Sequence, residues 1–308
     1  MNTPIYKIED KKNRIYIKRD DLFPYSFGGN KARKGMLFFK NIIYKKSDYV
    51  VTYGSSSSNH VRIISNKCAE LKIPCLIISP LEADKQTYNK KMYDLFGAKV
   101  IFTKLDNVSK KIDETLNDLK NKGYYPYFIQ GGGHGNIGTQ AYVDCYKEIK
   151  EYEKNKNLNF DYIFHASGTG TTQAGLVCGS IINNDNNKII GISIARMNPR
   201  GRNIVLKSVK DYLKERNINI SDEIIEKKVI FTDKYINGGY GKYNQKIIET
   251  IKNAMINYGI PMDTTYVGKA FTGMFSYIGD NEIKDKNILF IHTGGTPLFF
   301  DDLEELYE

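Results

Sequence analysis

Tryptophan is absent from this 308-residue chain, and histidine and cysteine are scarce, with four of each. The cysteines form no CxxC pair, and no histidine stands at metal-ligand spacing from them. This pattern excludes the common zinc and dithiol motifs, so we expect no metal site and free, buried thiols in a reducing cytoplasm. The four cysteines are Cys68, Cys75, Cys145 and Cys178.

Long apolar runs are also missing. No segment approaches the roughly 20 apolar residues that cross a bilayer as a helix. The opening stretch MNTPIYKIEDKK lacks the apolar core of a secretory signal. We therefore expect a cytoplasmic protein without membrane contact.

The formal net charge of the chain is +10, which invites a nucleic-acid-binding interpretation. The lysines, however, are spread along the whole chain and often stand beside acids, as in KKIDETLNDLKNK. That distribution is typical of solvated helix faces, so we expect no nucleic-acid partner. A positive field would still attract an anionic substrate.

Short β-branched runs alternate with longer segments of helical period. This alternation predicts an α/β fold with parallel-rich sheets covered by helices, and the length allows two domains. The predicted strands are 14–18, 49–53, 75–79, 99–103, 127–130, 162–166, 189–195 and 288–293, and the predicted helices include 86–96, 108–122, 137–154 and 242–258.

Several predicted strands end in glycine-, serine- or threonine-rich turns: GSSSSNH (54–60), GGGHGNIG (131–138), SGTGTTQAG (167–175) and HTGGTP (292–297). Ligands of open α/β sheets bind at the carboxyl ends of strands. The four turns therefore predict one shared cleft. His165 and His292 end apolar strands, and we interpret them as core residues.

The turn SGTGTTQAG connects a strand to a helix that we expect to begin near Thr172. Backbone N–H groups at a helix N-terminus, together with threonine hydroxyls, form a site for a phosphate. The turn lacks the GK[ST] ending of a Walker A loop and the spacing of a dinucleotide fingerprint. It predicts a cup for one phosphate monoester, although a glycine-rich turn without function is the alternative.

The stretch FGGNKARK places two glycines before Lys31. Cations are disfavoured at a helix N-terminus, where the macrodipole is positive. One interpretation is a basic first turn whose side chains point into water; the other is that Lys31 is needed for chemistry. A reactive lysine, a phosphate cup and polar donors such as Asn59 together imply pyridoxal phosphate.

The motifs resemble those of tryptophan-synthase-β-like pyridoxal phosphate enzymes of fold type II. The nearest group is that of the D-cysteine desulfhydrases and 1-aminocyclopropane-1-carboxylate deaminases. The resemblance runs from about residue 4 to residue 300. It rests on IYIKRDDLFPYSFGGNKARK, TYGSSSSNHVR, LFGAKV, GGGHGNIG, ASGTGTTQAGL, GGYGKY, DTTYVGKAF and LFIHTGGTP.

The resemblance implies a role for individual residues. Lys31 matches the Schiff-base lysine, Asn59 the residue that bonds the ring hydroxyl of the cofactor, and Thr293 the threonine beside the pyridine nitrogen. Ser58 matches a serine that meets the substrate carboxylate and takes part in proton transfer. Tyr240 and Tyr266 match two active-site tyrosines. The phosphate loop corresponds to Thr169, Gly170, Thr171 and Thr172, and we also expect substrate contacts from Ser58, Asn59, His60 and His134.

The implied fold is a two-domain homodimer with the cofactor between the domains. We predict a larger cofactor-binding domain from residues 1–46 and 151–308, and a smaller α/β domain from residues 47–150. Val267 follows Tyr266 where the deaminases carry a glutamate and the desulfhydrases commonly a threonine. Because a valine cannot hold the pyridine nitrogen protonated, we expect β-elimination rather than ring opening.

The expected activity is that of a pyridoxal phosphate lyase acting on a small amino acid with a β leaving group, similar to D-cysteine desulfhydrase. Ring-opening deamination, β-replacement and racemisation remain alternatives within the enzyme class. From another class, the alternative is a basic binding protein without turnover. The presence of Lys31, Asn59 and the phosphate loop argues against a binding protein without turnover, because such a protein does not need all three.

Overall fold

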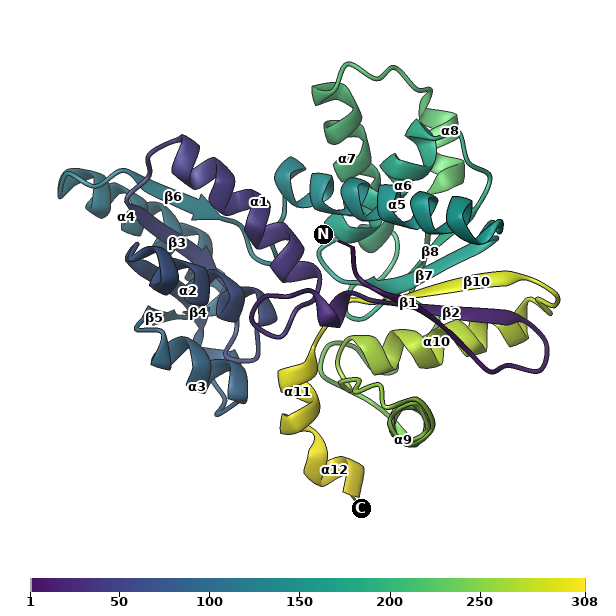
Figure 1. The fold of residues 1–308 in the computed structure, drawn as a ribbon. Coiled ribbons are helices and arrows are strands. Elements are labelled where there is room, and N and C mark those ends of the chain that lie inside the picture. The colour runs from purple at the N-terminus through teal and green to yellow at the C-terminus, as the bar shows by residue number, and fades with distance from the viewer. Residues whose placement is uncertain (1, 308) are drawn as a thin grey trace.

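A computed structural model describes residues 2–307 as an α/β protein with two sheets. Figure 1 shows the two sheets side by side, each with helices on both faces, and the long helix α1 running alongside the smaller sheet. The larger sheet has the strand order β1-β2-β10-β7-β8-β9, and the smaller has the order β5-β4-β3-β6. The predicted α/β class is confirmed.

The larger sheet is parallel except for its first strand, which pairs antiparallel with the second. Phe290 in the middle of this sheet stands beside Ile17 on one side and Phe164 on the other. The central strands are buried on both faces, which explains their continuous apolar sequences. The strands are β1 (Ile5–Ile8), β2 (Arg14–Arg19), β10 (Asn287–His292), β7 (Tyr162–Ser167), β8 (Lys188–Ser193) and β9 (Ile230–Thr232).

The smaller sheet is parallel throughout. Its strands are β5 (Lys99–Thr103), β4 (Cys75–Pro80), β3 (Tyr49–Tyr53) and β6 (Pro126–Ile129). The helices of the molecule are α1 (Asn30–Tyr44), α2 (Asn59–Leu71), α3 (Tyr88–Leu95), α4 (Val108–Asn121), α5 (Asn136–Lys156), α6 (Thr171–Ile182), α7 (Arg200–Glu215), α8 (Asp222–Lys228), α9 (Gln245–Tyr258), α10 (Val267–Asp280), α11 (Thr296–Asp301) and α12 (Leu303–Tyr307).

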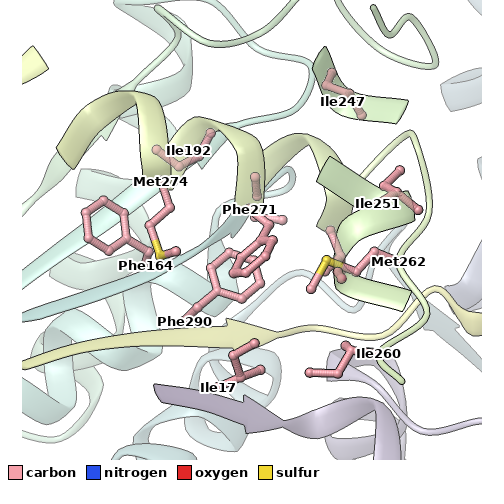
Figure 2. Close-up of a cluster of buried hydrophobic side chains, with 14 of the residues drawn as sticks. Ile17, Phe164, Ile192, Ile247, Ile251, Ile260, Met262, Phe271, Met274 and Phe290 are labelled. Carbon is pink, nitrogen blue, oxygen red and sulfur yellow. The ribbon is translucent and has the colours of Figure 1, made fainter. Parts of the chain in front are cut away.

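One face of the larger sheet packs against α9 and α10. Figure 2 shows Phe271 and Met274 of α10 lying on Phe164 and Phe290 of the sheet. The rings of Phe271 and Phe290 meet edge to face, with centroids 4.9 Å apart. Burying aromatic side chains of this size is the main favourable contribution to such a core.

All predicted strands and helices are confirmed, with ends displaced by at most three residues. Two strands of the larger sheet escaped prediction. Both are short: β1 has four residues, of which Tyr6 and Lys7 are exposed, and β9 has only three. Both are at the edges of the sheet, where burial is least.

The predicted domain boundaries stay a prediction. Two helices next to these boundaries pack against the apolar clusters as follows. Helix α1 contributes Phe38, Phe39 and Ile42 to the apolar cluster beneath the smaller sheet. Helix α5 contributes residues from Ala141 to Ile149 to the cluster of the larger sheet, and it packs against α6. Helix α1 also packs against α5, and the ion pair of Arg33 with Glu148 joins the two helices.

The predicted state of the cysteines is confirmed, since all four are free and buried. Within residues 2–307, no helix is both long and apolar enough to cross a membrane. The same residues contain no cluster of three or more histidine, cysteine or acidic side chains arranged for a metal ion.

Candidate active site

A cavity of about 640 Å³ lies at the carboxyl ends of strands from both sheets. All four glycine-rich turns contribute to its lining, so the predicted shared cleft exists. Of the described residues that line it, none is acidic. The predicted site residues in this lining are Lys31, Ser58, Asn59, His60, His134, Thr169, Gly170, Thr172, Tyr240, Tyr266 and Thr293; only Thr171 is missing.

The two glycines before Lys31 bring the start of α1 against two strand ends. Gly28 has a φ of +59°, and a Cβ there would lie 2.2 Å from the carbonyl oxygen of Asp21. Gly29 has a φ of +91°, and a Cβ there would lie 2.7 Å from the carbonyl oxygen of Thr293. Only glycine tolerates both the left-handed backbone and the close approach. The turn thereby fixes Lys31 beside the end of β10.

The amine of Lys31 donates a hydrogen bond to the carbonyl oxygen of Gly132, with 3.0 Å between nitrogen and oxygen. Burial, and then the positive charge of Arg196, lower the pKa of Lys31 to about 8. A lysine with this pKa has a substantial neutral fraction near physiological pH. Neutral amines attack aldehydes, so Lys31 suits a covalent role.

The cations that follow Lys31 do not point into water, which corrects the interpretation of a solvated basic turn. Arg33 is buried and donates to Asp20 and Glu148, at 2.7–2.9 Å. Lys34 is buried and donates to the hydroxyl of Thr171 at 2.8 Å. Their partners are more than 100 residues away in the sequence, except for Asp20.

The predicted phosphate loop links β7 to α6, and the helix begins at Thr171 after Gly170, whose φ is +98°. The hydroxyl oxygen of Thr172 accepts a hydrogen bond from Asn30 at 3.2 Å, and its own hydrogen can be donated into the cavity. The Thr171 side chain instead meets Lys34 outside the lining. First-turn residues of α6 include no acid, so its N-terminus is free to receive an anion.

Ser58 and Asn59 stand at the start of α2. The Ser58 hydroxyl accepts from the backbone N–H of Val61 at 3.3 Å, which is the capping role that such positions favour. The carboxamide oxygen of Asn59 accepts from Asn89 at 3.0 Å and from Arg62 at 3.5 Å. Both Ser58 and Asn59 line the cavity.

Two of the four histidines lie in the core and two line the cavity, as predicted. His165 and His292 are buried, and their rings meet the carbonyl oxygens of Ala166 and Pro261. His60 and His134 line the cavity. Burial lowers the pKa of His60 well below its usual value, and its Nε2 lies 2.8 Å from the hydroxyl of Thr52. The Nδ1 of His134 lies 3.2 Å from the carbonyl oxygen of Thr169, and burial also lowers the pKa of His134.

Two tyrosines form a hydroxyl pair at the cavity wall. The hydroxyl oxygens of Tyr240 and Tyr266 are 2.6 Å apart. Burial and the neighbouring Tyr240 raise the pKa of Tyr266 well above its usual value, so Tyr266 remains protonated. The buried Lys269 donates to the carbonyl oxygen of Gly239 at 2.5 Å, and this contact holds the loop that carries Tyr240.

The position of Val267 next to Tyr266 in the motif suggested a place at the cavity, but its side chain lies in the core. Its side chain is fully buried in the apolar cluster between α10 and the larger sheet, and it does not line the cavity. Tyr266, immediately before it, lines the cavity. It is the N-cap residue of α10, whereas Val267 is the first residue of the helix. Val267 therefore presents no side chain to the cavity, while Thr293 does line it. The expectation that this valine leaves a pyridine nitrogen unprotonated stays a prediction.

These donors fit pyridoxal phosphate. Lys31 offers an amine for the aldehyde, the N-terminus of α6 offers a site for the phosphate, and Asn59 and Thr293 offer polar groups for the ring. The cavity is lined by cations and donors and, among residues 2–307, by no carboxylate. Such a lining suits the negative charges of the phosphate and of an amino-acid carboxylate.

The family profile described as pyridoxal-phosphate dependent enzyme matches residues 1–294. The chain belongs to this family. It is 31% identical over 310 residues to proteins named D-cysteine desulfhydrase from Yersinia pestis and Yersinia pseudotuberculosis, which covers 97% of this chain and 92% of theirs. It is thus a pyridoxal-phosphate-dependent enzyme, which argues against the alternative of a binding protein without turnover.

Solved structures agree on the fold. The chain resembles a crystal structure described as an ACC deaminase homologue with a TM-score of 0.88 and 27% identity, covering 100% of this chain and 93% of that one. A hydrogen sulfide-producing enzyme matches with a TM-score of 0.68 over 98% of this chain and 88% of its own, at 18% identity. At that identity the likeness shows the fold alone.

Several lining residues of this family member escaped the sequence analysis: Asn30, Tyr53, Gln130 and Arg196. Arg196 follows β8, and its guanidinium donates to the carbonyl oxygen of Gly168. The signal that could have found it is its position, since it follows a predicted parallel strand as the four glycine-rich turns do.

Proposed function

We propose that the enzyme catalyses α,β-elimination of a small β-substituted amino acid, with cysteine, and D-cysteine in particular, as the first candidate. One observation carries the proposal: a single cavity without acidic lining gathers the amine of Lys31, the N-terminus of α6 and the amide of Asn59. The resemblance to proteins named D-cysteine desulfhydrase over nearly the whole chain supports this choice of substrate.

When bound, pyridoxal phosphate supplies an electron-withdrawing ring that stabilises negative charge at the substrate Cα. Lys31 is the residue that would hold it, through an amine that its environment keeps largely deprotonated above pH 8. The phosphate would be held by Thr169, Gly170 and Thr172 and by the backbone N–H of Thr171. Asn59 would donate to the ring hydroxyl oxygen, and Thr293 would meet the ring nitrogen.

The residues around the substrate would then act as acids, bases and donors. The amine of Lys31 would act as the base that takes the proton from the substrate Cα. Ser58, Asn59, His60 and His134 would contact the substrate, with the Ser58 hydroxyl and the α2 N-terminus receiving its carboxylate. Tyr266, which stays protonated, would donate a proton to the leaving group, and the hydroxyl of Tyr240 is its hydrogen-bond partner. The leaving group would depart from Cβ with its electron pair and the donated proton, and water would hydrolyse the released enamine to a keto acid and ammonia.

Ring opening of 1-aminocyclopropane-1-carboxylate is the second candidate, because the structure described as an ACC deaminase homologue is similar over the whole chain. The described residues of the cavity wall include no acid to keep a ring nitrogen protonated, whereas Thr293 offers a neutral hydroxyl. A weaker electron sink suits elimination, in which electrons leave promptly with the β group. β-Replacement and racemisation use the same groups.

Purified protein loaded with pyridoxal phosphate separates these candidates when it is given D-cysteine, L-cysteine, their analogues and the cyclopropane amino acid in turn. We expect release of sulfide, pyruvate and ammonia in equal amounts from a cysteine enantiomer. Release of 2-oxobutanoate from the cyclopropane substrate at an equal or greater rate would overturn the proposal. Formation of the opposite enantiomer without pyruvate would favour racemisation.

We further propose that the enzyme works as a homodimer in the cytoplasm, with a small amino acid rather than a nucleic acid as its partner. Four free and buried thiols support a reducing location. Light scattering after gel filtration measures the mass in solution, and a mass of one chain of 35.2 kDa would contradict the dimer.

A further inference from the structure

The orientation of the Asn59 carboxamide decides what it can do in the cavity. Only its NH₂ group can donate to a cofactor oxygen, while its oxygen would repel an ionised one. The inference below rests on the proposed role of Asn59 in holding the cofactor. The question is what keeps the NH₂ group, rather than the oxygen, directed into the cavity.

Asn89, the second residue of α3, is fully buried and lies outside the cavity lining. Its NH₂ group donates to the carbonyl oxygen of Ser57 at 2.9 Å and to the carboxamide oxygen of Asn59 at 3.0 Å. A backbone carbonyl is an acceptor only, so the contact with Ser57 fixes which end of Asn89 faces it. The same NH₂ group then requires the oxygen of Asn59 as its second acceptor.

Arg62 strengthens this arrangement from the other side. Its guanidinium, which has donors only, lies 3.5 Å from the same oxygen of Asn59 and is held by the carbonyl oxygen of Ser26. Two donors thus converge on one oxygen. The NH₂ group of Asn59 is left for the cavity, which Asn59 lines.

The oxygen of Asn89 has no hydrogen-bond partner in the part of the chain that the structure describes, although it is buried. Burying an unpaired polar atom destabilises a protein, and an apolar side chain would avoid it. A residue present only for packing would not require an amide here. The two donated hydrogen bonds account for an amide at this position.

We propose that Asn89 is a positioning residue that orients the Asn59 carboxamide, so that its NH₂ group donates to the ring oxygen of pyridoxal phosphate. Asn89 itself does not touch the cofactor. Its substitution should therefore act on the cofactor only through Asn59, and not through a general loss of structure.

The test compares Asn89→Asp, Asn89→Leu and Asn59→Ala, with Asn187→Asp as a matched control that loses a hydrogen bond to Tyr146 away from the cavity. Each apoprotein is titrated with pyridoxal phosphate, and the dissociation constant and the ratio of the two absorption bands that report ionisation of the ring oxygen are recorded. The melting temperature of each apoprotein shows whether the fold persists.

We expect Asn89→Asp and Asn59→Ala to weaken binding by about tenfold, the size of one lost hydrogen bond, and to shift the band ratio in the same direction. An aspartate cannot donate, so the Asn59 amide should turn its NH₂ group toward it. In the Asn59→Ala background, Asn89→Leu and Asn89→Asp should add little further loss. The Asn187→Asp control should bind like the parent protein.

Three results would overturn the proposal in distinguishable ways. If Asn59→Ala weakens binding while both Asn89 variants bind with an unchanged band ratio, Asn89 does not orient Asn59, and the role of Asn59 stands. If Asn59→Ala binds as the parent does, the role of Asn59 itself is wrong, and the inference falls with it. Equal losses from Asn89→Leu with and without Asn59 would assign Asn89 to the fold alone.

Discussion

The lowered pKa of Lys31 makes a prediction about how fast the protein captures an aldehyde. Burial is the larger cause, and the positive charge of Arg196 is the second. Only the neutral amine attacks a carbonyl carbon. Capture should therefore accelerate as the pH rises toward the pKa of Lys31 and level off above it.

The magnitude follows from the two pKa values. With a pKa of about 8 instead of 10.5, Lys31 titrates within the pH range of ordinary buffers. At pH 7 the neutral fraction is about one tenth, against about 0.03% for an ordinary lysine, a difference on the order of 300-fold. The folded-state pKa lies below that of the free side chain, so the neutral form is favoured throughout the window between pH 8 and 10.5.

Pyridoxal without its phosphate is a suitable probe, because it reports on the amine without contributions from the phosphate loop. The absorbance change after mixing with apoprotein gives the rate at each pH, and the rate of Lys31→Ala, which retains the other lysines, is subtracted. The variant Arg196→Met should move the midpoint upward and slow capture at pH 7. Lys227→Met, which removes an exposed charge paired with Glu223, should leave the midpoint unchanged.

A midpoint near that of an ordinary lysine, with the rate still climbing past pH 10, would refute this explanation. So would an Arg196→Met profile that moves to lower pH, because removing a positive neighbour can only favour the charged amine.

Three further predictions concern the loop, the ion pairs and the core. Thr172→Ala should weaken cofactor retention by about tenfold or more, since hydrogen bonds to charged groups contribute about 1.5–3 kcal/mol, and unchanged retention after dialysis would contradict this. Arg33→Met should lower the free energy of unfolding by about 3 kcal/mol in denaturant titrations, because Asp20 and Glu148 lose a buried partner; a change as small as that of Lys227→Met would contradict it. Val267→Glu should destabilise the fold by several kcal/mol without creating ring-opening activity, since its carboxylate would be buried among apolar side chains; a stable variant that releases 2-oxobutanoate would disprove that placement.

Patterns local in sequence predicted the parts of the site that the backbone determines. The turn before Lys31, the loop before α6 and the polar start of α2 each combine a strand end with special backbone residues, and each lines the cavity. The fold class followed in the same way from runs of buried β-branched residues. Edge strands such as β1 lack that signal.

Contacts between distant side chains could not be predicted. Nothing near Lys34 in the sequence indicates that its amine meets Thr171, and nothing near Asn59 indicates that Asn89 fixes its amide. Val267 shows a related limit. The adjacent residues Tyr266 and Val267 direct their side chains to the cavity and to the core respectively, and these directions depend on where α10 begins.

The central claim is that the cavity is built around Lys31, and its most direct test is to locate the cofactor. The holoenzyme is reduced with borohydride, digested, and mapped by mass spectrometry. The buried amines of Lys34, three residues further on, and of Lys269 are the internal controls, because burial lowers their pKa values as well. We predict one modified peptide, with the pyridoxyl group on Lys31, and no such peptide from Lys31→Ala. Modification of Lys34 or Lys269, or a reducible adduct at this cavity in Lys31→Ala, would contradict the claim.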